Sequence, residues 1–201
     1  EIDFESLPNQ FVMKTTHDSG GVIICKDKMM LDINDAKKTI NKSLKNNYYY
    51  SNREWQYKSI KPRIIIEEYL GEDISDYKIQ CFNGKVDDIM VCSGRYSKDG
   101  VKYYYFDKEW KYMPYCVYPG INEYTVNIKK PDNLAEMIDI AEQLSKDLIE
   151  VRIDLYNVNG KIYFGEITFF SNAGFDTTIT READIELGKK LKLKIGEENE
   201  D

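Results

Sequence analysis

Hydrophobic and polar residues alternate along several short stretches of the chain, which is the pattern of a β-strand that buries one face. Asn83-Gly84 and Asn159-Gly160 each separate two such stretches, and an Asn-Gly pair is typical of a tight hairpin turn. We therefore expect one β-hairpin around each of these turns. The strands predicted in this way cover residues 11–14, 22–25, 63–70, 77–82, 86–92, 101–107, 151–156 and 161–168.

A helical repeat occurs in other parts of the chain. The apolar residues that recur at every third or fourth position after Pro131 predict an amphipathic helix; they are Leu134, Met137, Ile138, Ala141 and Leu144. A second helix is expected over residues 35–45, with Asn34 or Asp35 as its N-cap, and a closing helix over 184–191. The aromatic-rich residues 48–57 are expected to be irregular or helical.

The hairpin around Asn159-Gly160 carries the main candidate for a site. Arg152, Asp154 and Tyr156 alternate with apolar residues, so they should share one strand face. The side chains that should share one face of the return strand are Ile162, Phe164, Glu166 and Thr168. Asp154 and Glu166 therefore converge if the register permits. Two adjacent carboxylates repel each other unless a cation lies between them, and oxygen ligands on a rigid sheet suit a magnesium ion that bridges nucleotide phosphates.

The alternative is that these are ordinary solvated residues on an exposed sheet face. Two features favour a metal–nucleotide site. Arg152 brings a cation to the same face as the acids, and residues 169–175 form a loop of apolar and small residues that suits close backbone approach by a ligand.

Composition limits the functions that the chain can have. Its 201 residues, of which 42% are hydrophobic, suffice for one sizeable domain or two small ones. The net charge of −7 argues against a nucleic-acid-binding surface. No stretch approaches the roughly 18 apolar residues of a membrane span. The first residues resemble neither a signal peptide nor a start, so we expect the chain to begin inside a longer protein.

Cysteine and histidine usage narrows the chemistry. The four cysteines show no Cys-x-x-Cys spacing and lie in apolar stretches, which predicts buried free thiols in a reducing, cytoplasmic setting. His17 is the single histidine, which nearly removes zinc sites and Ser-His or Cys-His catalysis from consideration.

Two further segments suit nucleotide contacts. Lys14 ends a strand and precedes the loop 15–21, where backbone N–H groups and a lysine can cover phosphates; a structural hairpin is the alternative. Residues 64–70 form an apolar strand that ends in acids. Its backbone can hold an adenine edge while Glu72 or Asp76 accepts hydrogen bonds from ribose hydroxyls; a core strand with solvated acids is the alternative.

The order of these three elements resembles the ATP-grasp superfamily, and most closely its TupA-like branch, found in bacterial surface-glycopolymer gene sets. The resemblance covers roughly residues 2–193. The segments that carry it are 7–14, 17–21, 54–58, 67–70, 76–78, 81–85, Asp107 with Trp110, and 152–156.

The resemblance implies an α+β chain with the ATP-grasp fold, in which the nucleotide is held between a small α+β lid subdomain and a larger antiparallel-sheet subdomain. The lid would cover residues 1–70 and the larger subdomain residues 71–195, followed by an acidic tail over 196–201. The part that usually precedes the lid looks missing.

The resemblance also assigns roles to residues of this chain. Lys14 would contact the nucleotide phosphates and act in catalysis with Arg152, which would stabilise the phosphoryl group in transfer. The loop over the phosphates would be a mobile cover that contacts the nucleotide through His17, Ser19, Gly20 and Gly21. The hinge that holds adenine would be Glu67, Glu68, Tyr69 and Leu70. Asp76 would bind the ribose, and Lys78 and Arg95 are secondary candidates for phosphate or carboxylate contacts.

Magnesium would be bound by Asp154 and Glu166. Many ATP-grasp ligases have Asn two residues after the metal-binding Glu, where this chain has Thr168. Either Thr168 is the third ligand, or Asn172 is, or water takes that place.

ATP-grasp ligases transfer the γ-phosphoryl group of ATP to a carboxylate, and an amine attacks the resulting acylphosphate. The resemblance thus implies a cytoplasmic, ATP- and Mg²⁺-dependent carboxylate–amine ligase that acts on a small molecule or a glycopolymer precursor. It leaves open an association with glycosyltransferases. Three alternatives remain: a kinase-like phosphotransferase, a nucleotide-binding module without catalysis, and a glycosyltransferase, although the chain lacks an Asp-x-Asp motif.

Overall fold

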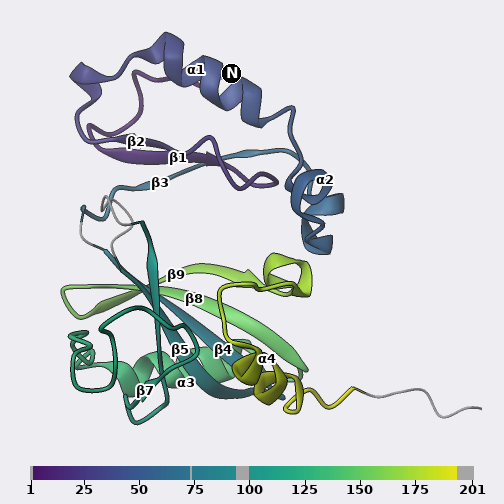
Figure 1. Ribbon diagram of the computed structural model, residues 1–201. Coiled ribbons are helices and arrows are strands. Elements are labelled where there is room, and N and C mark those ends of the chain that lie inside the picture. Colours follow the sequence, from purple (N-terminus) through teal and green to yellow (C-terminus); the bar gives the residue numbers. More distant parts are fainter. Residues whose placement is uncertain (1, 73, 94–99, 194–201) are drawn as a thin grey trace, which may run out of the picture. The chain divides into compact units, whose positions relative to one another are not determined.

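The computed structural model describes residues 2–72, 74–93 and 100–193 (Figure 1). The chain divides into two compact units: unit 1 is Glu1–Glu72 with Phe170–Phe175, and unit 2 is Asp73–Phe169 with Asp176–Asp201. Each unit has its own sheet and its own hydrophobic core. Arg95 and the predicted acidic tail lie outside the described residues.

Unit 1 is built on a three-stranded antiparallel sheet in the order β2-β1-β3. Its strands are β1 (Phe11–Thr15), β2 (Ile23–Cys25) and β3 (Ile64–Glu68). Phe11, Met13 and Cys25 point to one face of the sheet and pack with Ile40 of the helix α1 (Ile33–Ser43). The shorter helical segments of unit 1 are η1 (Lys28–Met30), α2 (Tyr48–Asn52), η2 (Trp55–Ser59) and η3 (Ser171–Gly174).

The helix α1 begins two residues earlier than the sequence predicted. Its N-cap is Asp32, whose backbone is extended and whose Oδ1 accepts hydrogen bonds from the N–H groups of Asn34 at 2.9 Å and Asp35 at 3.0 Å. An N-cap side chain satisfies the donors two and three residues further on, so the residues predicted as caps are the ones that Asp32 caps.

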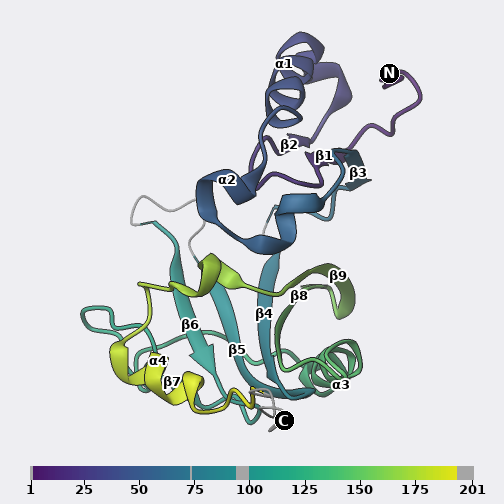
Figure 2. The ribbon, with the colours of Figure 1, turned by 90° about the vertical axis from the view of Figure 1, so that its right-hand side faces the viewer.

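Unit 2 contains a six-stranded antiparallel sheet in the order β7-β6-β5-β4-β8-β9 (Figure 2). Its strands are β4 (Ser75–Phe82), β5 (Lys85–Ser93), β6 (Lys102–Phe106), β7 (Tyr112–Met113), β8 (Glu150–Val158) and β9 (Lys161–Thr168). Its helices are α3 (Leu134–Leu144) and α4 (Arg181–Gly188).

The two faces of this sheet differ. One face packs against α3, where Ile79, Ile153 and Met137 are fully buried in the main core. On the other face, Ala183 of α4 packs with Tyr105 and residues that follow β7. The part of this second face that lies over β4, β8 and β9 carries polar side chains, because successive residues of a strand point to opposite faces.

The predicted strands are all present. The short strand β7 was not predicted, since two residues are too few to show alternation. The closing helix begins at Arg181 rather than 184, because the hydroxyl of Thr180 caps it by accepting from the N–H of Ala183 at 3.2 Å. All four cysteines are free thiols, three of them buried. Within the described part of the chain, every helix is too short or too polar to cross a lipid bilayer.

A β-bulge in β9 sets the position of Glu166. Leu155 lies opposite Phe164, but the preceding residue Asp154 lies opposite Glu166, so Gly165 is an extra residue in β9. The prediction that Phe164 and Glu166 share a face is therefore wrong: Phe164 shares the face of Leu155. The bulge places Glu166 on the face of Asp154, as classic bulges do when two residues oppose one.

Gly165 is the residue that fits this bulge. A Cβ atom at Gly165 would lie 2.9 Å from the carbonyl oxygen of Asp154 and 3.2 Å from the ring of Tyr156. Because the nearer atom is backbone, it cannot move aside as a flexible side chain could. The same substitution at Gly188, where nothing lies within 4 Å, meets no obstacle.

Gly165→Ala is accordingly expected to lower the free energy of unfolding of unit 2 by about 1–3 kcal/mol through overpacking. Gly188→Ala, at the end of a helix in the same unit, should leave stability unchanged or raise it by up to about 1 kcal/mol. Urea denaturation of the two variants measures the difference. Equal midpoints for both would show that the bulge tolerates a side chain.

Candidate functional site

The polar side chains on the sheet of unit 2 form two adjacent rows across β4, β8 and β9. One row is Lys78, Asp154 and Glu166, and the other is Gln80, Arg152 and Thr168. Residues directly opposite on antiparallel strands have Cβ atoms about 4.5–5.5 Å apart, so the side chains of each row can interact. The register thus brings together the predicted metal ligands and the predicted catalytic arginine.

Arg152 is the centre of this cluster. Its Nε donates to Asp154 Oδ1 at 2.7 Å and its Nη2 to Asp154 Oδ2 at 3.0 Å, which is a bidentate pairing. Its Nη2 also lies 3.3 Å from Glu166 Oε1 and 3.1 Å from Thr168 Oγ1. The Thr168 hydroxyl donates to Glu166 Oε1 at 3.2 Å. One guanidinium group therefore contacts all three side chains that were candidates for metal ligands on these strands.

Lys78 is a second cation in the cluster. Its Nζ donates to Asp154 Oδ2 and lies 3.3 Å from Asp76 Oδ2. Asp76, predicted to bind ribose, is buried and belongs to the same group of charges as the predicted metal ligands. The predicted role of Asp76 stays a prediction.

The two cations of the cluster remain charged. Burial alone would lower the pKa of Lys78, but the charge of Asp154, opposed by Arg152 and assisted by Asp76, raises that pKa above the usual lysine value. Burial would likewise lower the pKa of Arg152, but the hydrogen bond and charge of Asp154, with Glu166 and Asp76, raise that pKa instead. The cluster therefore offers permanent positive charge to an anion.

The cluster also suits a divalent cation in the kind of its donors. Among the residues that the structure describes, no three His, Cys, Asp or Glu side chains are grouped as a metal site. Two carboxylates and one hydroxyl nevertheless share a rigid sheet face, and oxygen ligands of this kind are those that Mg²⁺ prefers. The carboxylates of Asp76, Asp154 and Glu166 outnumber the cations Lys78 and Arg152. The cluster thus has one carboxylate more than it has cations, so a bound cation would balance its charge.

Of the two candidates for the third ligand, Thr168 lies within the cluster. Asn172 belongs to unit 1, where its backbone N–H lies 3.3 Å from Glu54 Oε1. Asn172, Ala173 and Gly174 have successive φ angles of 51°, 54° and 80°, a left-handed turn in which Ala173 is unusual. Thr168 is thus the candidate whose oxygen contacts another predicted ligand.

In unit 1 the structure brings Lys14 next to the predicted hinge. Lys14 Nζ lies 2.8 Å from Glu67 Oε2, and both side chains are partly exposed. A hollow in this unit is lined by two segments, 7–10 and 66–69, so that Glu67, Glu68 and Tyr69 border it. Leu70 is the second residue after β3 and is half-buried.

The predicted phosphate cover is anchored at its start. His17 is fully buried, and its Nε2 lies 3.3 Å from the carbonyl oxygen of Leu44. Asp18 accepts a hydrogen bond from the Ser43 hydroxyl at 2.7 Å. Gly21 packs closely against Ser43, because a Cβ atom at Gly21 would lie 2.6 Å from the Ser43 side chain. Ser19 is exposed. Contacts of His17 with a nucleotide would therefore have to come from its backbone, whereas Ser19, Gly20 and Gly21 remain accessible candidates.

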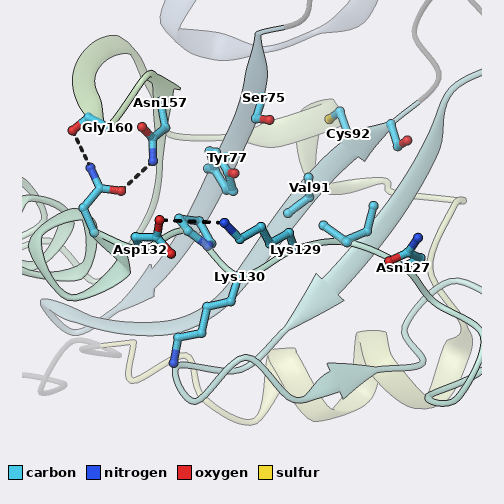
Figure 3. A pocket seen from close by; sticks show the side chains of 14 residues that line it. Ser75, Tyr77, Val91, Cys92, Asn127, Lys129, Lys130, Asp132, Asn157 and Gly160 are labelled. Atoms are coloured by element: carbon cyan, nitrogen blue, oxygen red, sulfur yellow. Dashed lines mark hydrogen bonds and ion pairs between the residues drawn. The ribbon is translucent and has the colours of Figure 1, made fainter.

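Unit 2 has a separate pocket of about 600 Å³, shown in Figure 3. Tyr77 and Val91 come from the core-facing side of the sheet, and Lys129 and Lys130 lie on the segment that crosses in front of it. None of the predicted site residues that the structure describes lines this pocket. The geometry of charges, rather than the size of a cavity, defines the candidate site.

Sequence reasoning missed two acids beside the candidate residues, the half-buried Glu150 and the buried Glu54. Glu150 accepts a hydrogen bond from Gln80 in the row next to Arg152, and burial raises the pKa of Glu150. Glu54 is buried in unit 1 and reaches Asn172, which is remote in sequence. The sequence offered one signal for Glu54: it is the first residue of segment 54–58, one of the segments that carry the family resemblance. The resemblance assigned no role to that segment.

Comparison with solved structures identifies the class of fold. A crystal structure of D-alanine–D-alanine ligase from Bacillus anthracis complexed with ATP matches 94% of this chain at 15% sequence identity, with a TM-score of 0.52. Another crystal structure of D-alanine–D-alanine ligase from Bacillus anthracis matches 94% of the chain at 17% identity, with a TM-score of 0.50. The chain spans 51% and 53% of those two ligases. The chain therefore shares the fold of these ligases.

The family is more specific than the fold. Residues 1–192 match the TupA-like ATPgrasp family, and the chain belongs to that family. No curated protein matches the sequence.

Proposed function

We propose that this chain is the ATP-binding part of a carboxylate–amine ligase that depends on ATP and magnesium. The observation that carries the proposal is the contact of one guanidinium, that of Arg152, with Asp154, Glu166 and Thr168. Such a cluster can hold a divalent cation and an anionic phosphoryl group side by side. The D-alanine–D-alanine ligases of similar fold support the reaction class, and one of their structures holds ATP.

In this proposal Asp154, Glu166 and Thr168 would hold Mg²⁺, which would supply charge neutralisation to the ATP phosphates. Arg152 and Lys78 supply fixed positive charge to the phosphoryl group in transfer. Lys14 would contact the nucleotide phosphates, and the hinge Glu67–Leu70 would hold adenine through its backbone. Asp76 would accept hydrogen bonds from the ribose hydroxyls.

The reaction proceeds by two displacements. A carboxylate oxygen of the first substrate bonds to the γ-phosphorus while the bond from that phosphorus to the β–γ bridging oxygen breaks, which releases ADP. An amine then attacks the acyl carbon, inorganic phosphate leaves, and the amine loses a proton. Neither step needs a histidine, because positioning and charge neutralisation supply the catalysis.

The TupA-like relationship supports a sugar acid or peptide of a surface glycopolymer as the substrate, and an association with glycosyltransferases. A kinase-like phosphotransferase is the second candidate, since the same charges would serve a hydroxyl acceptor. Product analysis with γ-labelled ATP separates them. A ligase yields ADP, free phosphate and a new amide, a kinase yields a stable phosphoester, and binding without turnover contradicts both.

Lys14→Met is expected to weaken ADP binding by roughly 10-fold, because one charge-assisted hydrogen bond contributes about 1.5–3 kcal/mol. The melting temperature without nucleotide should change little, since the Lys14–Glu67 pair is partly exposed and such pairs stabilise weakly. Lys26→Met is the matched control, because Lys26 makes a similar exposed pair with Glu72 in the same unit. Calorimetric titration measures the affinities. A sharp fall in melting temperature with unchanged affinity would make Lys14 structural.

A further inference from the structure

Unit 1 exposes a group of aromatic and basic side chains on α2 and η2, two segments that can be followed in Figure 2. Tyr50 is 67% exposed and Trp55 60% exposed. Their neighbours Tyr49, Arg53 and Lys58 complete the group, which we call the aromatic–cation surface. Large aromatic side chains grouped at a surface commonly mark a binding site.

The two cations of this surface are held by ring faces. Lys58 Nζ lies 4.4 Å from the ring centroid of Trp55 and 5.3 Å from that of Tyr49. The guanidinium of Arg53 lies 5.6 Å from the ring centroid of Tyr49. Within the described ranges, neither Arg53 nor Lys58 forms an ion pair with a carboxylate. Both charges are therefore ordered by the rings and available to an anion.

The local charge is opposite to that of the whole chain. Residues 45–63 contain five lysines and arginines and a single acid, Glu54, whereas the chain has a net charge of −7. Glu54 is itself buried and accepts hydrogen bonds from Asn52 Nδ2 at 2.8 Å and Gln56 Nε2 at 2.9 Å, so the exposed charges of this segment are basic. A basic surface on an acidic protein favours an anionic ligand.

Glu54 also connects this surface to the segment that follows the strand of the candidate metal ligands. The backbone N–H of Asn172 lies 3.3 Å from Glu54 Oε1, and residues 170–175 follow β9 after one intervening residue, Phe169. Within unit 1, the segment that carries the aromatic–cation surface is thus hydrogen-bonded through Glu54 to residues 170–175.

We propose that the aromatic–cation surface binds a carboxylate-bearing sugar ring. The C–H face of a pyranose packs against the exposed ring of Trp55 or Tyr50, and its carboxylate accepts hydrogen bonds from Arg53 and Lys58. The inference rests on the proposed ligase function, because the bound sugar would be part of the acceptor substrate of that ligase. An anionic membrane fits less well, because α2 has five residues and forms no extended amphipathic face.

Trp55 itself provides the signal for a test. The chain has two tryptophans, and Trp110→Phe removes the other one, which is stacked on Phe106 in unit 2. In this background, tri-galacturonic acid should change the fluorescence of Trp55 in a saturable manner, whereas neutral maltotriose should not. Lys58→Met and Arg53→Gln should each weaken the binding at least 5-fold. Lys37→Met is the matched control, because Lys37 also lies over an aromatic ring of unit 1, that of Phe4 at 5.7 Å, and should leave the affinity unchanged.

Three outcomes would overturn the inference: absence of a saturable change, equal affinity in the Lys58→Met and Lys37→Met variants, or a response to phosphatidylglycerol vesicles without one to tri-galacturonic acid. ADP binding measured by calorimetry on the same protein separates this inference from the proposed function. If ADP binds and the sugar does not, the surface assignment fails alone. If the sugar binds as expected and the chain binds neither ATP nor ADP, the ligase proposal fails while the sugar site stands.

Discussion

Glu166→Gln is expected to reduce magnesium-dependent ATP turnover by roughly 100-fold or more while leaving the fold intact. Removing a partner that merely orients a metal ligand typically costs about 10–100-fold, so removing a ligand charge should cost at least as much. The side chain of Glu166 is 51% exposed and its pairing with Arg152 is long at 3.3 Å, so its loss should hardly affect stability. Steady-state ADP release at increasing Mg²⁺ concentration measures the effect.

Glu136→Gln provides the control for this experiment, because Glu136 is an exposed acid on α3, which packs against the opposite face of the sheet. Its turnover should match that of the unchanged protein. Normal turnover in a folded Glu166→Gln variant would remove Glu166 from the proposed metal site.

Arg152→Lys is expected to lower both stability and turnover. A lysine keeps the charge, but its single ammonium group cannot reproduce the bidentate contact with Asp154 and reach Glu166 and Thr168 as well. Asp154 is buried, so the weakened pairing should lower the free energy of unfolding by about 1–3 kcal/mol. Lys78, which also contacts Asp154, limits the loss. Loss of a transition-state charge contact should reduce kcat by about 100-fold or more.

The control for Arg152 is Arg181→Lys, an exposed arginine at the start of α4. Urea denaturation and kcat are measured on both variants. A variant of Arg152 that lost stability but kept its kcat would show that the guanidinium organises the sheet face without acting on the phosphoryl group.

The local features of the fold could be predicted because their causes are local. Asn83-Gly84 and Asn159-Gly160 adopt positive φ angles throughout, as their residue types indicated, and this fixes two hairpins of unit 2. The helix α3 follows from its apolar repeat. The starts of α1 and α4 were misplaced because capping depends on Asp32 and Thr180, polar residues that precede the apolar pattern.

The candidate site could be predicted only in part. Arg152, Asp154 and Glu166 could be recognised as candidate site residues because they are charged residues within otherwise apolar strands. Lys78, which pairs with Asp154, was assigned a secondary role, since its place opposite Asp154 depends on the pairing of β4 with β8, which no turn specifies. The link between Glu54 and Asn172 joins residues far apart in sequence and has no local signal.

The bulge at Gly165 has a numerical signature in the sequence. A two-residue turn at Asn159-Gly160 pairs positions whose numbers have an odd sum, as for Leu155 with Phe164. The pairs Asp154 with Glu166 and Arg152 with Thr168 have even sums. The pairing at the site is therefore shifted by one residue from the register that the turn sets. In a related chain with one residue fewer between the turn and the Glu, the same side chains would face one another without a bulge. The spacing and the glycine should therefore change together: the shorter hairpin has no need of a glycine before its Glu, and the longer one does.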